Sequence, residues 1–209
     1  MKSVFIKHLF WILLLLPALL QAKEYKEGVD YIKLATSLPT QNADKIEVQE
    51  FFWYGCPHCF QFEPKINAWV KNKPAKVEFV RTPAPLNPNW MVHTKTYYAL
   101  EAMGKGEQYH SDLFSALHVT KLKLYTPEAV ADFLAQKDVN RTKFLDTFNS
   151  FAVEMRARKA AQLGTQYKIT GVPALTVNGK YVVNTNGAGG FDEALNIVNY
   201  LVAKETAGK

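Results

Sequence analysis

Hydrophobic residues recur along this chain with two different periods, and their order predicts the elements. Short apolar runs typical of strands occupy 46–53, 77–81, 174–177 and 180–183. Apolar residues three and four positions apart, typical of helices, occupy 57–70, 90–103, about 109–117, 126–134, a longer stretch from 144 toward 163, and the chain from 191 onward. The pattern therefore predicts strand, helix, strand, a helical block, a β-hairpin and a closing helix.

Turn-forming residues mark the ends of these elements. The proline-rich stretch at 82–88 cannot continue a helix or a central strand. Thr126 followed by Pro127 is typical of a helix start, and Gly104 of a helix end. Asn178-Gly179 between two apolar runs is the strongest short signal for a hairpin.

The helical block separates two α/β segments of the sequence, which we expect to fold together as one domain. Without it, roughly 110 residues remain in the order βαβ…ββα, which is a plausible size for one small domain. We therefore expect an α/β domain formed by 23–85 and 162–209, interrupted by a helical insertion at 86–161.

The first 22 residues have the pattern of a secretory signal peptide. Lys2 and Lys7 precede an apolar run at 9–20, which is too short to span a bilayer but suits the core of a signal. Ala22 is the best cleavage point, although Leu20 is large where a small residue is usual. We expect the mature protein to start at Lys23 in an oxidising compartment; the alternative is a retained membrane anchor.

Composition and charge exclude several classes of protein. With 48% hydrophobic and 21% charged residues, the 209-residue chain is neither disordered nor collagen-like. Without Lys2 and Lys7 the net charge falls from +6 to +4, and the basic residues form no dense stripe, so we expect no nucleic-acid partner. Two cysteines cannot form a disulfide scaffold.

Those two cysteines lie in the motif Cys56-Pro57-His58-Cys59, between a predicted strand and a predicted helix. At a helix N-terminus, unsatisfied N–H groups and the helix dipole stabilise an anion. Pro57 at the first helical position needs no N–H partner, and His58 can offer a hydrogen bond or a positive charge to the same sulfur. These effects lower the pKa of Cys56 and favour the reduced form of the pair.

Other interpretations of the motif are weaker. Half of a zinc site would require a second Cys or His pair, which the sequence lacks. A structural disulfide closing so short a loop would add little stability, and two unrelated buried thiols do not suit an oxidising compartment. We therefore interpret the motif as a redox site.

Two further features of the sequence are informative only in combination with that motif. Val172-Pro173 precedes the hairpin; proline permits a cis peptide, but an ordinary trans proline is the default from sequence alone. Glu50 lies within the predicted strand at 46–53. A buried carboxyl there would have a raised pKa and could exchange a proton with a thiol, whereas an edge position would leave it solvated.

The segment at 50–64, EFFWYGCPHCFQFEP, closely resembles the active-site segment of the DsbA family of bacterial periplasmic oxidoreductases. The segments TGVPA at 170–174 and VNGKY at 177–181 resemble the same family. The similarity extends over essentially the whole mature chain, the helical insertion included. It implies a thioredoxin fold with an inserted all-helical domain.

The resemblance also implies residue roles. Cys56 would be the exposed nucleophile and Cys59 its buried partner, with Pro173 in the cis form beside the disulfide. Val172 would offer its backbone to a substrate peptide, and Glu50 would be the buried acid below the thiols. His8, His93, His110 and His118 show no ligand spacing, and we interpret them as surface or capping residues.

We predict a periplasmic thiol:disulfide oxidoreductase that donates the Cys56–Cys59 disulfide to newly exported, unfolded proteins with free cysteines. The resemblance implies reoxidation by a membrane quinone reductase of the DsbB type, and we expect a monomer. No Gly-rich phosphate loop or metal-ligand spacing occurs, so we expect no cofactor. Two alternatives stay open: a reductase or isomerase of the same fold, and a non-catalytic peptide-binding module with a structural disulfide.

Overall fold

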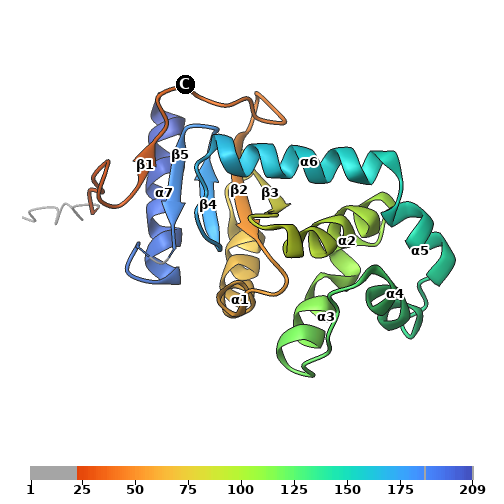
Figure 1. Cartoon of the computed structure of the whole chain (residues 1–209). Coiled ribbons are helices and arrows are strands. Elements are labelled where there is room, and N and C mark those ends of the chain that lie inside the picture. Colours follow the sequence, from red (N-terminus) through yellow and green to blue (C-terminus); the bar gives the residue numbers. More distant parts are fainter. Residues whose placement is uncertain (1–22, 186, 209) are drawn as a thin grey trace, which may run out of the picture.

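The computed structural model describes residues 23–185 and 187–208, and its centre is a five-stranded sheet (Figure 1). The predicted signal peptide with its Ala22 cleavage point, and His8, lie outside the described residues. The strand order is β1-β5-β4-β2-β3. The strands are β1 (Ile32–Lys33), β2 (Ile46–Phe52), β3 (Val77–Pro83), β4 (Ala174–Val177) and β5 (Tyr181–Asn184). Only β2 and β3 run parallel; the other neighbours are antiparallel.

Helices cover both faces of this sheet (Figure 1). One face packs on α1 (Pro57–Asn72) and α7 (Phe191–Ala207), in a core that includes Val48, Phe62 and Val198. A second core lies on the other side, where Phe51 of β2 meets the ring of Tyr167 at 5.5 Å. The remaining helices belong to that core: the 3₁₀ turn η1 (Pro88–Trp90), α2 (Met91–Ala102), α3 (Gly106–His118), α4 (Pro127–Ala135), α5 (Arg141–Phe148) and α6 (Phe151–Gln166).

Strand β2 is the element that positions the rest. All seven of its residues are buried, because β3 and β4 flank it and helices cover both of its faces. Its side chains alternate between the two cores, with Val48 in one and Phe51 in the other. The chain leaves this buried strand at Phe52 and reaches α1 at Pro57 after a short loop.

The predicted order of elements is confirmed. Strand β3 runs two residues further than predicted, to Pro83, because it lies at the edge of the sheet, where a proline is tolerated. Two other differences concern a helix and a strand. The single helix expected from 144 toward 163 is two helices, because α5 ends at Phe148 and the Ser150 hydroxyl caps α6 by accepting the Val153 N–H at 3.3 Å. Strand β1 was not predicted. It has only two residues and exists by pairing with β5, which lies far away in sequence.

The hairpin turn confirms the role of Asn178-Gly179. Both residues have positive φ, 52° and 67°, and lie at the centre of a turn that the Lys180 N–H closes by donating to the Val177 carbonyl at 3.0 Å. The connection between β4 and β5 is therefore the three residues 178–180, one more than predicted. A Cβ on Gly179 would also collide with the backbone carbonyl oxygen of Leu38. Glycine is therefore required there twice, for its backbone angle and for the close approach of another segment.

The helical part joins the sheet without a linker. Helix α6 runs from Phe151 to Gln166, so the predicted boundary between 161 and 162 falls inside one continuous helix. The division into 23–85 and 162–209 on one side and 86–161 on the other stays a prediction. Within 23–185 and 187–208 no helix is both long and apolar enough to cross a bilayer.

Candidate active site

Cys56 stands where β2 gives way to α1. A three-residue loop follows the strand, and the Cys56 N–H closes it by donating to the Trp53 carbonyl at 2.9 Å. Cys56 is the N-cap residue of α1 with an extended backbone, and Pro57 occupies the first helical turn. The sulfur thus lies at the end of a helix whose first N–H groups have no partner within the helix.

The two cysteines differ in accessibility. Both thiols are free in this structure, and Cys59 is completely buried while Cys56 keeps 8% of its surface exposed. The expectation of an exposed Cys56 therefore needs correction: the residue is buried, and its sulfur lies 3.5 Å from the Val172 carbonyl oxygen. It is still the member of the pair that solvent and a second thiol can reach, beside the exposed Pro57 and His58.

The surroundings of Cys56 favour its anion. Its pKa falls to about 6, chiefly because the Cys59 thiol donates a hydrogen bond to its sulfur; burial opposes this. The backbone N–H groups of Cys59 and His58 and the charge of His58 lower the pKa further. Burial and the neighbouring Cys56 sulfur raise the pKa of Cys59, so Cys59 keeps its proton. One accessible thiolate beside one buried thiol is the arrangement of a reactive dithiol.

A second loop reaches the same sulfur from the far end of the chain. The Val172–Pro173 peptide bond is cis, as the resemblance implies. The Cys56 thiol lies 3.5 Å from the Val172 carbonyl oxygen and can donate to it. Pro173 is tied to the hairpin, since the Thr185 hydroxyl donates to its carbonyl at 2.7 Å. Val172 therefore presents its backbone directly beside Cys56.

Glu50 is buried beneath this site. It is 0% exposed, and neither carboxyl oxygen makes a hydrogen bond of ordinary geometry among the described residues. Burial, together with the negative charge of Glu63, raises its pKa to about 8, although Arg81 opposes the rise. Its charge in turn contributes to raising the pKa of Cys59. Of the two environments considered for Glu50, the structure shows the buried one.

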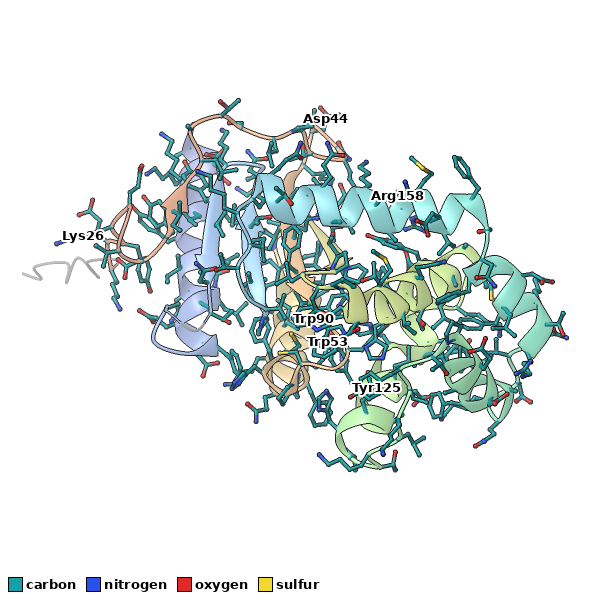
Figure 2. The ribbon with its side chains drawn as sticks, viewed as in Figure 1. Lys26, Asp44, Trp53, Trp90, Tyr125 and Arg158 are labelled. Carbon is teal, nitrogen blue, oxygen red and sulfur yellow. The ribbon has the colours of Figure 1, made fainter. Side chains whose placement is uncertain are left out.

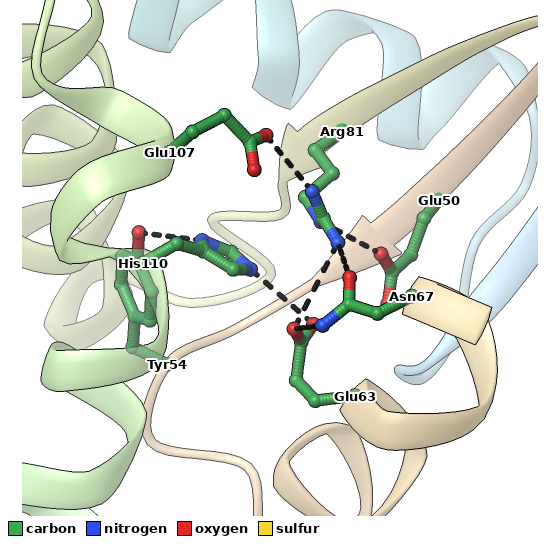
Figure 3. Close-up of polar contacts among 7 residues, drawn as sticks. All are labelled: Glu50, Tyr54, Glu63, Asn67, Arg81, Glu107 and His110. Carbon is green, nitrogen blue, oxygen red and sulfur yellow. Dashed lines mark hydrogen bonds and ion pairs between the residues drawn. The ribbon is translucent and has the colours of Figure 1, made fainter. Parts of the chain in front are cut away.

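A polar cluster around Glu50 was not predicted from the sequence (Figure 3). Its members are Glu50, Tyr54, Glu63, Asn67, Arg81, Glu107 and His110. Arg81 stands opposite Glu50 in the β2–β3 register, with its Nε 3.4 Å from the Glu50 carboxylate. Two signals for the cluster were present. Arg81 is a charge within an apolar strand, and Glu63 lies one helical turn after Cys59, on the same buried side of α1.

The interpretation of the histidines as surface or capping residues is wrong for His93 and His110. They are 2% and 3% exposed, because both lie on helix faces that pack into the second core. Burial lowers the pKa of His93 to about 4, and its Nε2–H donates to the Leu124 carbonyl at 2.7 Å. His118, half-buried, donates to the Tyr54 carbonyl at 2.8 Å and stacks on Phe60. His110 joins the polar cluster beneath the cysteines.

Aromatic residues border the active-site loop on its helical side. Figure 2 shows Trp53 and Trp90 beside each other with Tyr125 close by, and the two indole rings stack at 4.1 Å. They line a groove of about 490 Å³ together with Asn87, Pro88, Asn89 and Val92. The Trp53 ring can lie there because Gly55 has no Cβ; a Cβ at that position would collide with the ring. An aromatic surface with polar neighbours thus adjoins the redox site.

The comparisons with known proteins agree with this geometry. A family model described as a DSBA-like thioredoxin domain matches residues 91–196. The curated thiol:disulfide interchange protein DsbA of Pseudomonas aeruginosa is 46% identical over 187 residues, which cover 90% of this chain and 89% of the relative. The corresponding protein of Azotobacter vinelandii is 42% identical over 190 residues, 91% of this chain and 89% of the relative. The chain belongs to the DsbA family.

Solved structures of the DsbA family show the same fold. The crystal structure of Pseudomonas aeruginosa DsbA matches with a TM-score of 0.84, over 88% of this chain and 96% of that one. Xylella fastidiosa DsbA matches with a TM-score of 0.80 at 32% identity, over 85% and 96%. These findings confirm the predicted family, the thioredoxin-like fold with its helical part, and the enzyme class, a thiol:disulfide oxidoreductase.

The family model begins after the cysteines, so it does not itself cover the redox motif. The matches to the two curated relatives cover 90% and 91% of this chain and therefore include the motif. Among residues 23–185 and 187–208, no group of three or more His, Cys, Asp or Glu side chains is arranged to hold a metal ion.

Proposed function

We propose that this protein donates its Cys56–Cys59 disulfide to unfolded proteins with free cysteines. One arrangement carries the proposal: Cys56 lies at the N-terminus of α1 with a trace of exposure, beside the completely buried Cys59. These surroundings lower the pKa of Cys56 to about 6 and raise the pKa of Cys59. A stabilised thiolate is a good leaving group, and a stabilised reduced form makes the pair oxidising. A disulfide with a purely structural role requires neither a stabilised thiolate nor a stabilised reduced form.

The exchange runs through a mixed disulfide. A substrate thiolate attacks Cys56 Sγ, the Cys56–Cys59 bond breaks, and its electron pair passes to Cys59. A second substrate thiolate then attacks the substrate sulfur of the mixed disulfide and releases Cys56 as a thiolate. The substrate loses two electrons and gains a disulfide, and the protein gains them as a dithiol.

Glu50 is proposed as the proton reservoir for the buried thiol. The Cys59 thiolate formed in the first step has to be protonated, because burial disfavours its charge. Glu50 has a pKa of about 8 and therefore carries a proton at neutral pH. In the return direction its carboxylate takes the proton from Cys59, so that Cys59 can attack Cys56 Sγ and expel a bound thiolate.

The substrate-binding part is proposed at Val172 and Pro173. The Val172 carbonyl lies 3.5 Å from Cys56 Sγ, so it is placed to accept a backbone N–H from a peptide whose cysteine has joined Cys56. An unfolded chain also exposes apolar side chains, and the aromatic surface of Trp53 and Trp90 adjoins the site. Both features suit extended chains rather than one folded partner.

The proposed location is the periplasm, reached through the predicted signal at 1–22. An oxidising compartment keeps the disulfide formed and supplies newly exported proteins as substrates. The proposed reoxidant, implied by the family, is a membrane quinone reductase of the DsbB type. The proposed assembly is a monomer, since one chain contains Cys56, Cys59, Val172 and Glu50.

Equilibration with glutathione tests the function. The protein is titrated with reduced and oxidised glutathione and then offered a reduced, unfolded peptide with two cysteines. We expect glutathione to reduce the pair readily and the oxidised protein to form the peptide's disulfide. A pair that stays oxidised against a large excess of reduced glutathione would instead support a structural disulfide, and rapid reshuffling without net oxidation would support an isomerase.

A further inference from the structure

Three carboxyl groups surround the single guanidinium of Arg81 (Figure 3). Its Nη1 lies 3.0 Å from Glu107, its Nε 3.4 Å from Glu50 and its Nη2 3.8 Å from Glu63. The Glu107 side chain is 81% exposed and is solvated, whereas those of Glu50 and Glu63 are 0% and 8% exposed. Two buried carboxyls thus share one cation with a solvated third, which favours a proton on one of the buried pair.

The two buried carboxyls differ in the number of hydrogen-bond donors that reach them. Glu63 accepts from His110 Nε2 at 3.2 Å and from the Asn67 amide at 3.0 Å. Glu50 has no ordinary hydrogen bond within the described residues and only the Arg81 contact. A carboxylate is stable in a buried site when donors satisfy it, so the charge belongs on Glu63 and the proton on Glu50.

His110 can donate to Glu63 because Tyr54 occupies its other nitrogen. The Tyr54 oxygen lies 2.9 Å from Nδ1, and burial raises the pKa of this phenol, so its O–H is available as a donor. If Nδ1 accepts, the ring hydrogen is on Nε2 and points at Glu63. The rings of Phe52 and Phe114 pack on the imidazole at 5.1 and 5.2 Å and hold it there.

We infer that His110 is a positioning residue of the exchange site: by donating to Glu63 it assigns the shared proton to Glu50, the carboxyl that acts on Cys59. The inference rests on the proposed function, in which Glu50 exchanges a proton with the buried thiol. It also gives the helical part of the fold a role in the chemistry, since His110 comes from α3 while both carboxyls come from elements of the sheet domain.

Loss of the His110 donor should move the proton. Burial alone raises the pKa of Glu63, and the His110 hydrogen bond is the largest effect that lowers it. Without it Glu63 takes the proton, and Glu50 loses the negative neighbour that raised its own pKa. The ionisable and polar groups that face this pair are Arg81 from β3, Glu107 and His110 from α3, Asn67 and Cys59 from α1, Tyr97 from α2 and Tyr54 from the loop.

The test compares His110→Phe, which removes the donor, with His110→Gln, whose amide can still donate to Glu63. The carboxyl carbons of Glu50 and Glu63 are titrated by NMR in the reduced, full-length mature protein and assigned with Glu50→Gln and Glu63→Gln. We expect the Glu50 midpoint to fall by on the order of one pH unit in His110→Phe and the Glu63 midpoint to rise. His110→Gln should keep both midpoints near their original values.

His93→Phe is the matched control, because His93 is an equally buried histidine outside this cluster, bonded to Leu124. It should alter stability without moving Glu50. If His110→Phe does not fold, Tyr54→Phe should shift the midpoints in the same direction by less. An unmoved Glu50 midpoint in the folded variant, or equal shifts in His110→Phe and His110→Gln, would overturn the inference.

The pH profile of the Cys59 step gives a second reading. The rate at which Cys59 displaces a thiol from a mixed disulfide on Cys56 should change around the Glu50 midpoint and shift with it in His110→Phe. The NMR titration needs no activity, so it decides the role of His110 even if the protein fails to oxidise peptides. That failure would overturn the proposed function alone.

Discussion

The Cys59 thiol donates a hydrogen bond to the sulfur of Cys56, and this bond lowers the Cys56 pKa more than the charge of His58 does. The sequence drew attention to His58 and to the helix N-terminus, and both do contribute. The larger effect comes from the buried partner, which cannot ionise itself and so remains a donor. The two cysteines therefore have pKa values shifted in opposite directions, and this difference can be measured.

Replacing each neighbour of Cys56 separately should rank their effects. His58→Leu removes a charge and should raise the Cys56 pKa from about 6. Cys59→Ala removes the strongest donor and should raise it further. Ultraviolet absorbance of the thiolate against pH measures both variants, with Cys56→Ala as the blank. A larger rise in His58→Leu than in Cys59→Ala would contradict this ranking.

The two cysteine variants should behave differently when mixed disulfides are trapped. Cys59→Ala leaves Cys56 able to react but removes its intramolecular partner, so mixed disulfides with exported proteins should accumulate. Cys56→Ala should trap none, because Cys59 is completely buried. Non-reducing gels of both variants, repeated after reduction, provide the measurement. Trapping by Cys56→Ala would mean that the nucleophile has been assigned to the wrong residue.

The reduced protein should be more stable than the oxidised one, and by more at pH 8 than at pH 5. Cys56 has a folded pKa of about 6, below its unfolded value, so its contribution is complete above the unfolded pKa and is lost as pH falls through about 6. The oxidised protein has no thiol to titrate. Each 30 mV by which the folded pair is more oxidising than the unfolded pair corresponds to about 1.4 kcal/mol.

Denaturant unfolding of both redox forms across this pH range measures that difference. His58→Leu should reduce the advantage of the reduced form at pH 7, where the Cys56 thiolate prevails. An oxidised form that is the more stable one at pH 7 would point to a structural disulfide, since a bridge ordinarily stabilises by restricting the unfolded chain.

Arg81→Met should destabilise the protein strongly and in a pH-dependent way. It removes the only cation within ion-pair distance of Glu50 among the described residues and leaves Glu63 with His110 and Asn67 alone, a loss of about 3–5 kcal/mol. Both carboxyl pKa values then rise, so the loss should be largest above pH 8 and should shrink as pH falls and the carboxyls take up protons.

Lys65→Met is the control for that variant. It breaks an ion pair with Asp192 whose side chains are 42% and 76% exposed, so the loss should stay below about 1 kcal/mol. Urea unfolding at pH 5 and pH 8 compares the two variants. An Arg81→Met loss that is small, or that grows toward acid pH, would show that the cation does not balance buried charge.

Much of the fold and the redox motif was determined by sequence alone, because these features are local. Cys56 and Cys59 lie three residues apart at a helix start, and Pro57 and the preceding strand specify that start within a few residues. Asn178-Gly179 likewise specifies its own turn. The long segments similar to a known family extended these local signals to Val172 and Pro173, far along the chain.

The electrostatics beneath the thiols were decided only by tertiary structure. Glu50, Glu63, Arg81 and His110 come from four elements, and no local pattern tells which of them meet. The same holds for β1, which forms only by pairing with the distant β5. Contacts of this kind depend on strand register and helix packing, so charge pairing and burial at this site follow from the assembled fold, whereas a turn or a helix start follows from its own residues.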